Sequence, residues 1–167
     1  MVLKPNGDPN EAGGVLNPAA ARAPSGDLLL YPRCVAEGNI SRIGIVRATR
    51  AGRSYQVERL HYALEPHAPY ELRPRSGYGC EDPRVTYMPA LQAYVMAYTA
   101  VGPDGPRIAF AVSKDAYDWQ RIGLANFSGT GNPEGDDKDG AFFPEAVQAP
   151  SGTPSLAFYH RPMLHLS

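Results

Sequence analysis

The chain has 167 residues, of which 43% are hydrophobic and 20% are charged, a composition that supports one folded domain and excludes a disordered tail. Sixteen basic and 17 acidic residues give a net charge of −1, so the chain lacks the basic surface that attracts nucleic acids or anionic membranes. The two cysteines, Cys34 and Cys80, are too few for a disulfide framework or a cysteine-based zinc site, and we expect no metal centre.

The N-terminal stretch MVLKPNGDPNEAGG lacks the apolar core of a secretion signal. No run approaches the roughly 18 apolar residues that a membrane-spanning helix needs. We therefore expect a cytoplasmic protein with no membrane partner.

Glycine and proline are frequent, with 17 of each, and they are scattered without a period between runs rich in tyrosine and valine. Short runs of this kind, separated by turn-forming residues, are typical of many short strands joined by tight turns. The composition therefore predicts an all-β fold.

Three apolar runs that end in tyrosine recur along the chain: LLLY (28–31), VMAY (95–98) and LAFY (156–159). Their tyrosines are 67 and 61 residues apart, and each run follows a proline-containing polar element and a turn. Such self-similarity at a fixed period indicates a repeat architecture.

Two further strands are expected after each of the first two tyrosines. They are SRIGIVRA (41–48) and RSYQVERL (53–60) in the first unit, and PRIAFAVS (106–113) and YDWQRIGL (117–124) in the second. Four strands per unit predict the blade of a β-propeller. In the turn between the last two, Asp115 is expected to accept backbone N–H groups, and Trp119 to wedge between neighbouring sheets.

Units of about sixty residues mean that this chain holds only two and a half to three blades, with residues 1–16 as an N-terminal extension and 17–167 as a partial propeller. Closing the ring is what removes exposed sheet edges. We therefore expect the chain to be the N-terminal part of something larger, or an assembly partner, which includes a second copy in a homo-oligomer, to supply the rest.

Several segments resemble glycoside hydrolase family 130, the inverting β-mannoside phosphorylases and β-mannosidases, which are five-bladed β-propellers. They are NPAAARAPSGDLLLYPR (17–33), GCEDPRVTYMPALQAYVMAYTA (79–100), IAFAVSKDAYDWQRIG (108–123), DKDGAFFPE (137–145) and YHRP (159–162). The resemblance implies an enzyme that acts on mannose-containing oligosaccharides without a cofactor, using inorganic phosphate as co-substrate if it is a phosphorylase.

By this resemblance Asp82 is the general acid, which protonates the departing glycosidic oxygen as positive charge develops on the sugar. In the phosphorylases of the family this proton passes through a hydroxyl of the mannose itself. Glu81 is expected to be a neighbour of Asp82 or a partner of Arg84, because adjacent side chains of a strand point to opposite faces.

The resemblance and the repeat together suggest the remaining site residues. Asn17, Asp82 and Glu145 are expected at equivalent points of three blades, where the inner strands face one channel. The resemblance implies sugar contacts from Asn17 and Arg33 and phosphate contacts from Arg121 and Lys138. Asp139 and Glu145 remain as bases or sugar ligands, and His160 and Arg161 are further candidates for the pocket.

Three alternatives stay open. A phosphorylase must hold phosphate with arginine or lysine side chains, whereas a hydrolase needs a second carboxylate to activate water. The chain is alternatively a non-catalytic carbohydrate-binding fragment. It is also compatible with another five-bladed glycosidase, acting on arabinose- or fructose-containing glycans, because one fold serves many sugars.

Overall fold

The computed structural model describes residues 3–127 and 135–163. Within these ranges the chain forms strands and four short 3-10 helices, with no α-helix. The 3-10 helices are η1 (Pro9–Glu11), η2 (Glu37–Asn39), η3 (Pro69–Glu71) and η4 (Pro89–Leu91). No helix of the described residues is long and apolar enough to cross a membrane.

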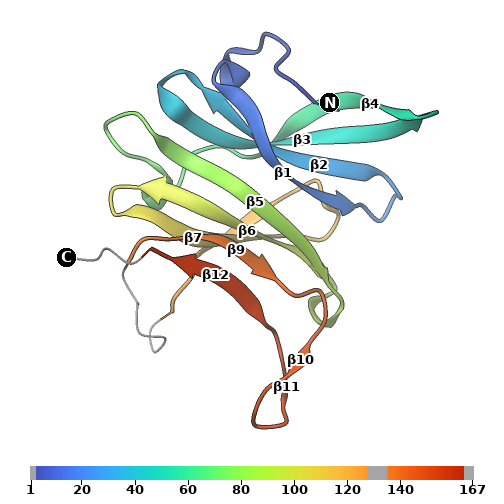
Figure 1. The fold of residues 1–167 in the computed structure, drawn as a ribbon, viewed down its shortest axis with the longest axis vertical. Coiled ribbons are helices and arrows are strands. Elements are labelled where there is room, and N and C mark those ends of the chain that lie inside the picture. The colour runs from blue at the N-terminus through green and yellow to red at the C-terminus, as the bar shows by residue number, and fades with distance from the viewer. Residues whose placement is uncertain (1–2, 128–134, 164–167) are drawn as a thin grey trace.

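The strands form two consecutive four-stranded antiparallel sheets and the beginning of a third (Figure 1). Blade 1 consists of β1 (Gly14–Arg22), β2 (Leu28–Ala36), β3 (Ile40–Ala51) and β4 (Ser54–Leu64). Blade 2 consists of β5 (Tyr78–Met88), β6 (Ala93–Gly102), β7 (Gly105–Ser113) and β8 (Gln120–Leu124). The start of blade 3 pairs β9 (Asp137–Phe142) with β12 (Phe158–Pro162), and a short hairpin of β10 (Val147–Gln148) and β11 (Pro154–Ser155) extends between them.

This arrangement confirms the all-β class and the blade repeat, because the described residues form two complete blades and the first two strands of another. The tyrosines that end the three runs lie in β2, β6 and β12. A short parallel contact between the start of β3 and the start of β5 joins the first two blades. The boundary between an extension and a propeller at residue 17 stays a prediction, although β1 already begins at Gly14.

The three tyrosines are not all equivalent in the blades. Arg33 lies opposite the residue before Asn17, Thr99 opposite the residue before Asp82, and Arg161 opposite the residue before Asp139. Tyr31 and Tyr159 each lie two residues before their reference positions, Arg33 and Arg161. Tyr98 lies only one residue before Thr99. Because side chains alternate between faces, the second tyrosine points to the opposite face of its blade from the other two.

The core lies between blades 1 and 2. It contains Leu29, Tyr31, Ile43 and Ile45 from blade 1 and Tyr94, Met96, Ala109 and Ala111 from blade 2, all buried. The Tyr31 hydroxyl donates to the Ala116 carbonyl at 2.7 Å, and its ring meets the edge of Trp119 with ring centroids 5.6 Å apart. The indole is thus wedged against the neighbouring blade, as the sequence predicted.

Aromatic side chains join blade 2 to the start of blade 3. Phe110 of β7 packs against Phe142 of β9 and Phe158 of β12, with ring centroids 5.2 and 5.4 Å apart. Gly140 allows this approach, because a Cβ there would lie only 2.4 Å from the Phe158 ring. The two ends of β9 therefore differ, with tightly packed rings toward its C-terminus and polar residues at its start.

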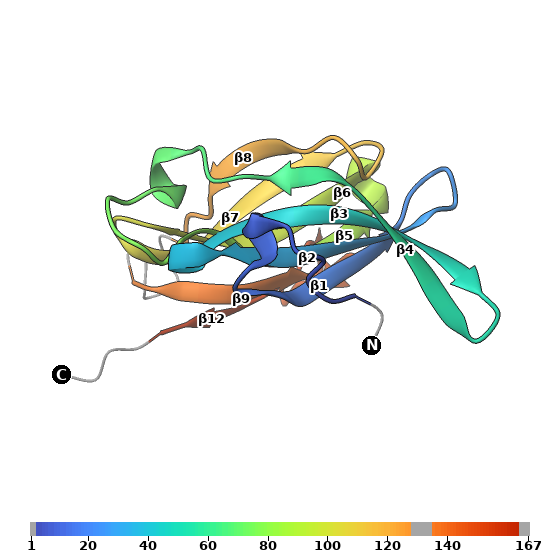
Figure 2. The same ribbon diagram turned by 90° about the horizontal axis from the view of Figure 1, so that it is seen from above.

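The inner strands of the three blades lie along one side of the molecule, because β5 contacts both β1 and β9. In Figure 2, β1 and β9 lie toward one side and β8 toward the other. The polar residues near the start of each inner strand thus converge on a common side.

On the far face of blade 1, a buried carboxylate holds the N-terminal segment in place: Glu11 of η1 accepts a hydrogen bond from Arg59 Nε at 2.6 Å.

Candidate active site

The same backbone irregularity recurs near the start of each inner strand. Asn17, Asp82 and Asp139 have positive φ angles of 41°, 47° and 58°, in the left-handed region. Each precedes a proline or glycine, and strand register shifts at or beside each position. Aspartate and asparagine tolerate this conformation better than other non-glycine residues, and local strain of this kind concentrates at functional sites.

The bulge at Asp82 places two adjacent carboxylates within reach of one arginine. Arg33 of β2 donates from one nitrogen to Glu81 Oε1 at 2.8 Å and from another to Asp82 Oδ1 at 3.4 Å. The expectation that Glu81 and Asp82 point to opposite faces assumed a regular strand. It is wrong here, because the left-handed residue turns the Asp82 side chain toward the side that Glu81 occupies.

The two oxygens of Asp82 have different surroundings. Oδ1 accepts from the Asn17 side-chain amide at 2.9 Å and from Arg33, so blade 1 supplies both donors. Within the described residues, Oδ2 has no hydrogen-bond partner. The carboxyl is therefore fixed in orientation through one oxygen while the other remains available to a ligand.

Glu81, like Asp82, is held through one oxygen, Oε1. It accepts from Arg33 and from the Ser41 hydroxyl at 3.3 Å. The pKa of Glu81 lies above the ordinary 4.5, chiefly because of burial and also because of the neighbouring Asp82 charge. The charges of Arg33 and Lys138 oppose this rise. Arg84 is not its partner, contrary to expectation, because its guanidinium donates to the Pro83 carbonyl.

The start of blade 3 contributes a second polar group. Arg161 Nε donates to Asp139 at 2.8 Å, and both side chains are substantially exposed. His160 Nδ1 lies 2.6 Å from the nearly buried Asp137, and its ring stacks on Phe127 with centroids 4.1 Å apart. Arg161 thus belongs with Asp139, whereas His160 belongs with the packing between blades 2 and 3.

Two predicted site residues are placed elsewhere. Glu145 lies beyond the end of β9 in an exposed segment, so Asp139, and not Glu145, is the blade 3 equivalent of Asn17 and Asp82. Arg121 of β8 binds the fully buried Glu71 through two nitrogens, at 2.8 and 2.9 Å. That contact pairs its guanidinium with a buried carboxylate, and its expected role as a phosphate ligand stays a prediction.

Sequence reasoning did not single out Ser41 or Asn39, which complete the surroundings of Arg33. Arg33 donates to Ser41 Oγ at 2.9 Å and to Asn39 Oδ1 at 3.4 Å. Neither residue carries a local motif, and only the β2–β3 pairing places them beside Arg33. The missed equivalence of Asp139, by contrast, had a signal: an Asn or Asp followed by Pro or Gly at the start of each inner strand.

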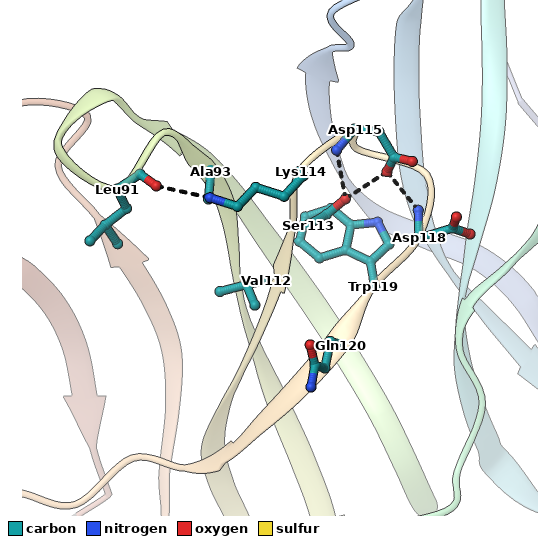
Figure 3. Close-up of a pocket in the computed structure, with 9 residues that line it drawn as sticks. All are labelled: Leu91, Ala93, Val112, Ser113, Lys114, Asp115, Asp118, Trp119 and Gln120. Atoms are coloured by element: carbon teal, nitrogen blue, oxygen red, sulfur yellow. Dashed lines mark hydrogen bonds between the residues drawn. The ribbon is translucent and has the colours of Figure 1, made fainter.

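A cavity of about 510 Å³ lies away from these residues, at the end of β7 and the start of β8 (Figure 3). Its polar groups are used locally: Asp115 accepts the backbone N–H groups of Tyr117 and Asp118, and Lys114 donates to the Leu91 carbonyl. Asp115 thus fills its expected structural role. The cavity contains none of the predicted site residues.

No cluster of three or more potential metal ligands occurs in the part of the chain that the structure describes. The inner strands present carboxylates, an amide and cations: Asp82 and Glu81, Asn17, and the side chains of Arg33 and Lys138. A carboxyl with one unbound oxygen, oriented by neighbouring donors, can give or accept a proton at a bound ligand.

Comparison with known proteins gives this arrangement a family. A family model described as beta-1,4-mannooligosaccharide phosphorylase matches residues 3–166. No curated protein sequence matches the chain significantly. A solved glycosyl hydrolase from Bacteroides ovatus is 26% identical, with a TM-score of 0.65 over 88% of this chain and 46% of that one.

Two further structures are similar. A second Bacteroides ovatus protein, described as a glycoside hydrolase, is 28% identical, with a TM-score of 0.60 over 77% of this chain and 37% of that one. The beta-1,2-mannobiose phosphorylase from Listeria innocua is 19% identical and supports the fold alone, with a TM-score of 0.65 over 90% of this chain and 52% of that one. The chain spans about half the length of these structures, or less, and forms about half of a five-bladed propeller. It belongs to glycoside hydrolase family 130.

Proposed function

We propose that this chain forms the catalytic half of an enzyme that cleaves β-mannosides with inversion, by phosphorolysis to mannose 1-phosphate. The observation that carries the proposal is the Asp82 carboxyl, which Asn17 and Arg33 hold through Oδ1 while Oδ2 has no partner among the described residues. Family membership supports a mannoside as the substrate.

In the proposed reaction Asp82 supplies the proton from Oδ2. The bond between the anomeric carbon and the departing oxygen breaks, and the proton reaches that oxygen through a mannose hydroxyl, as the family resemblance implies. A phosphate oxygen forms the new bond from the opposite face of the ring. Asn17 and Arg33 act as positioning residues, because they prevent the carboxyl from rotating and leave one oxygen directed at the sugar.

Two features favour phosphate over water as the attacking group. Lys138 and Arg84 form no ion pair with a carboxylate within the described residues, so both cations remain available to an anion. Glu81 and Asp139 each bind an arginine at 2.8 Å, closer than the 3.4 Å between Arg33 and Asp82, so an arginine neutralises each of them more closely than it does Asp82 and disfavours them as the base that water attack requires. Hydrolysis is the second candidate, with the base contributed from outside this chain.

The experiment is incubation of a protein with the complete propeller and β-mannosides, with and without inorganic phosphate. We expect mannose 1-phosphate to form only when phosphate is present. Release of free mannose at the same rate in both conditions would assign hydrolysis instead. Binding of the mannoside without any cleavage would leave a carbohydrate-binding role and reject the catalytic proposal.

A further inference from the structure

A second polar surface lies at the end of the propeller where the inner strands begin. Three connections meet there: the turn at η2, the connection between β4 and β5, and the turn between β6 and β7 (Figure 1, left). Gly77 N donates to the Gly38 carbonyl at 2.7 Å. A Cβ on Gly102 would lie 2.4 Å from the Tyr70 carbonyl oxygen, so the third connection also packs closely.

These connections surround a cavity of about 560 Å³, here called the rim groove, lined by Arg73, Pro74, Arg75, Ser76 and Pro103. Among the described residues no acidic side chain lines it, although Asp104 follows Pro103 in the chain. The Arg73 guanidinium is held in place because Nε donates to the Ser76 carbonyl at 3.1 Å. Arg75 is exposed and has no ion pair or hydrogen bond among the described residues.

The rim groove and Asp82 are connected through Arg33. Arg33 binds both Asp82 and Asn39. A Cβ placed on Gly77 would lie 3.6 Å from the Asn39 amide nitrogen and 2.8 Å from the Arg73 guanidinium. Asp82 is also only four residues from the start of β5, on the same end of the sheet. A saccharide whose mannose reached Asp82 from this end would therefore extend past the rim groove.

We propose that the rim groove binds an anionic substituent, a carboxylate or a phosphate ester, on the sugar attached to the mannose. The inference rests on the proposed function for the saccharide part of the ligand. Two guanidinium groups without a carboxylate between them match the planar, bidentate geometry of such anions. The two proline rings add a stiff apolar surface beside them. A neutral mannoside would leave both guanidinium groups without an anionic partner.

The test measures equilibrium binding to a protein with the complete propeller by calorimetry. The ligands are neutral β-1,4-mannobiose, the matching disaccharide with glucuronic acid in place of the second sugar, and two anions alone, glucuronic acid and glucose 6-phosphate. The proteins are the wild type, the double variant R73Q/R75Q and the control R53Q. Arg53 is an exposed arginine in the turn between β3 and β4, at the opposite end of the sheets.

The wild type is expected to bind the acidic disaccharide about 5- to 10-fold more tightly than mannobiose, as one or two exposed charge-assisted contacts would give. This preference should vanish in R73Q/R75Q, persist in R53Q and fall as salt is raised. Equal affinities in the wild type, or a preference that survives R73Q/R75Q, would overturn the proposal.

The free anions separate this inference from the proposed function. Binding of either anion that depends on Arg73 and Arg75, without binding of mannobiose, would support the anion site in the rim groove and reject a mannoside as the substrate. The stronger of the two anions would identify the substituent as carboxylate or phosphate ester. Binding of mannobiose with no effect of charge would reject the anion site and support a mannoside as the substrate. Binding of none of the four ligands would reject both proposals.

Discussion

Two clusters of arginine and carboxylate groups lie near the junction of blades 1 and 2, and they differ in how completely their oxygens are used. Glu71 is 0% exposed and accepts from His67 N, Ala68 N, the Tyr98 hydroxyl and two nitrogens of Arg121. Asp82 is partly exposed and accepts only through Oδ1. A fully bound carboxylate can only stabilise, whereas an oxygen without a partner can act on a ligand.

The loss of the acid at Asp82 should produce the largest effect. In a protein with the complete propeller, Asp82→Asn keeps the shape of the side chain but cannot deliver a proton. We expect kcat to fall by about 10² to 10⁴ with little change in affinity, the range typical of positioned acid catalysis. The substrate must be a β-mannoside with a poor leaving group, because an activated aryl group departs without protonation.

Asp118→Asn provides the control, because Asp118 is an exposed aspartate of the turn before β8. It should leave kcat unchanged. Retention of most activity by Asp82→Asn on the unactivated substrate would assign Asp82 to the bulge alone, as a turn-forming residue.

Glu71→Ala should be the most destabilising substitution in the other cluster. It leaves the partly buried Arg121 guanidinium without its carboxylate partner, and breaking a buried ion pair from one side costs about 3 to 5 kcal/mol. Urea denaturation of the chain measures the free energy of unfolding. Glu58→Ala is the matched control, because its pair with Arg47 at 2.9 Å is exposed and should contribute about 0 to 1 kcal/mol. Equal losses in the two variants would contradict the comparison.

The sequence predicts the blades well because their information is local. Turn residues, apolar runs and the repeat period determine where strands begin and end, and the expected strands of both complete blades match β2–β4 and β6–β8. The pairing of Asn17 with Asp82 also followed from the repeat, since equivalent points of neighbouring inner strands approach one another.

The errors at the site have a common physical cause, because they depend on side-chain direction rather than on strand position. Glu81 and Asp82 share a side only through the left-handed bulge, which a regular strand pattern does not contain. The pairing of Arg121 was not foreseen either, because its partner Glu71 lies in η3, fifty residues earlier in the chain. Contacts between residues so far apart in the chain cannot be predicted from the local sequence around either residue.

Tyr98→Phe should have a smaller effect than Glu71→Ala, because it removes one donor and leaves the ion pair intact. The Tyr98 hydroxyl donates to Glu71 at 2.6 Å, and a hydrogen bond to a charged group is worth about 1.5 to 3 kcal/mol. Tyr31→Phe is a matched control, since that buried hydroxyl donates to a neutral carbonyl, for which about 0.5 to 1.5 kcal/mol is expected. Thermal and urea unfolding should rank Tyr98→Phe as the more damaging change, and the reverse order would count against a charged Glu71.

The smallest expected effect is a difference in pH dependence between the two clusters. Burial raises the pKa of Glu71. The hydrogen bonds from Arg121, Tyr98 and the backbone together lower it by more, so the pKa lies below the ordinary 4.5. Its contribution to stability is therefore present above pH 4.5 and is lost as the pH falls through the folded-state value.

Glu81 has a raised pKa, chiefly because of burial, so its contribution has the opposite sign. That contribution is complete below pH 4.5 and is lost as the pH rises through the folded-state value. Glu71→Gln should therefore flatten the loss of stability in acid, whereas Glu81→Gln should make stability rise more steeply just above pH 4.5. Urea unfolding from pH 3 to 7 measures both slopes, independently of the constant loss that each substitution causes. If both variants changed the slope in the same direction, the two carboxylates would be in equivalent electrostatic surroundings, and the division into a stabilising cluster and a reactive one would fail.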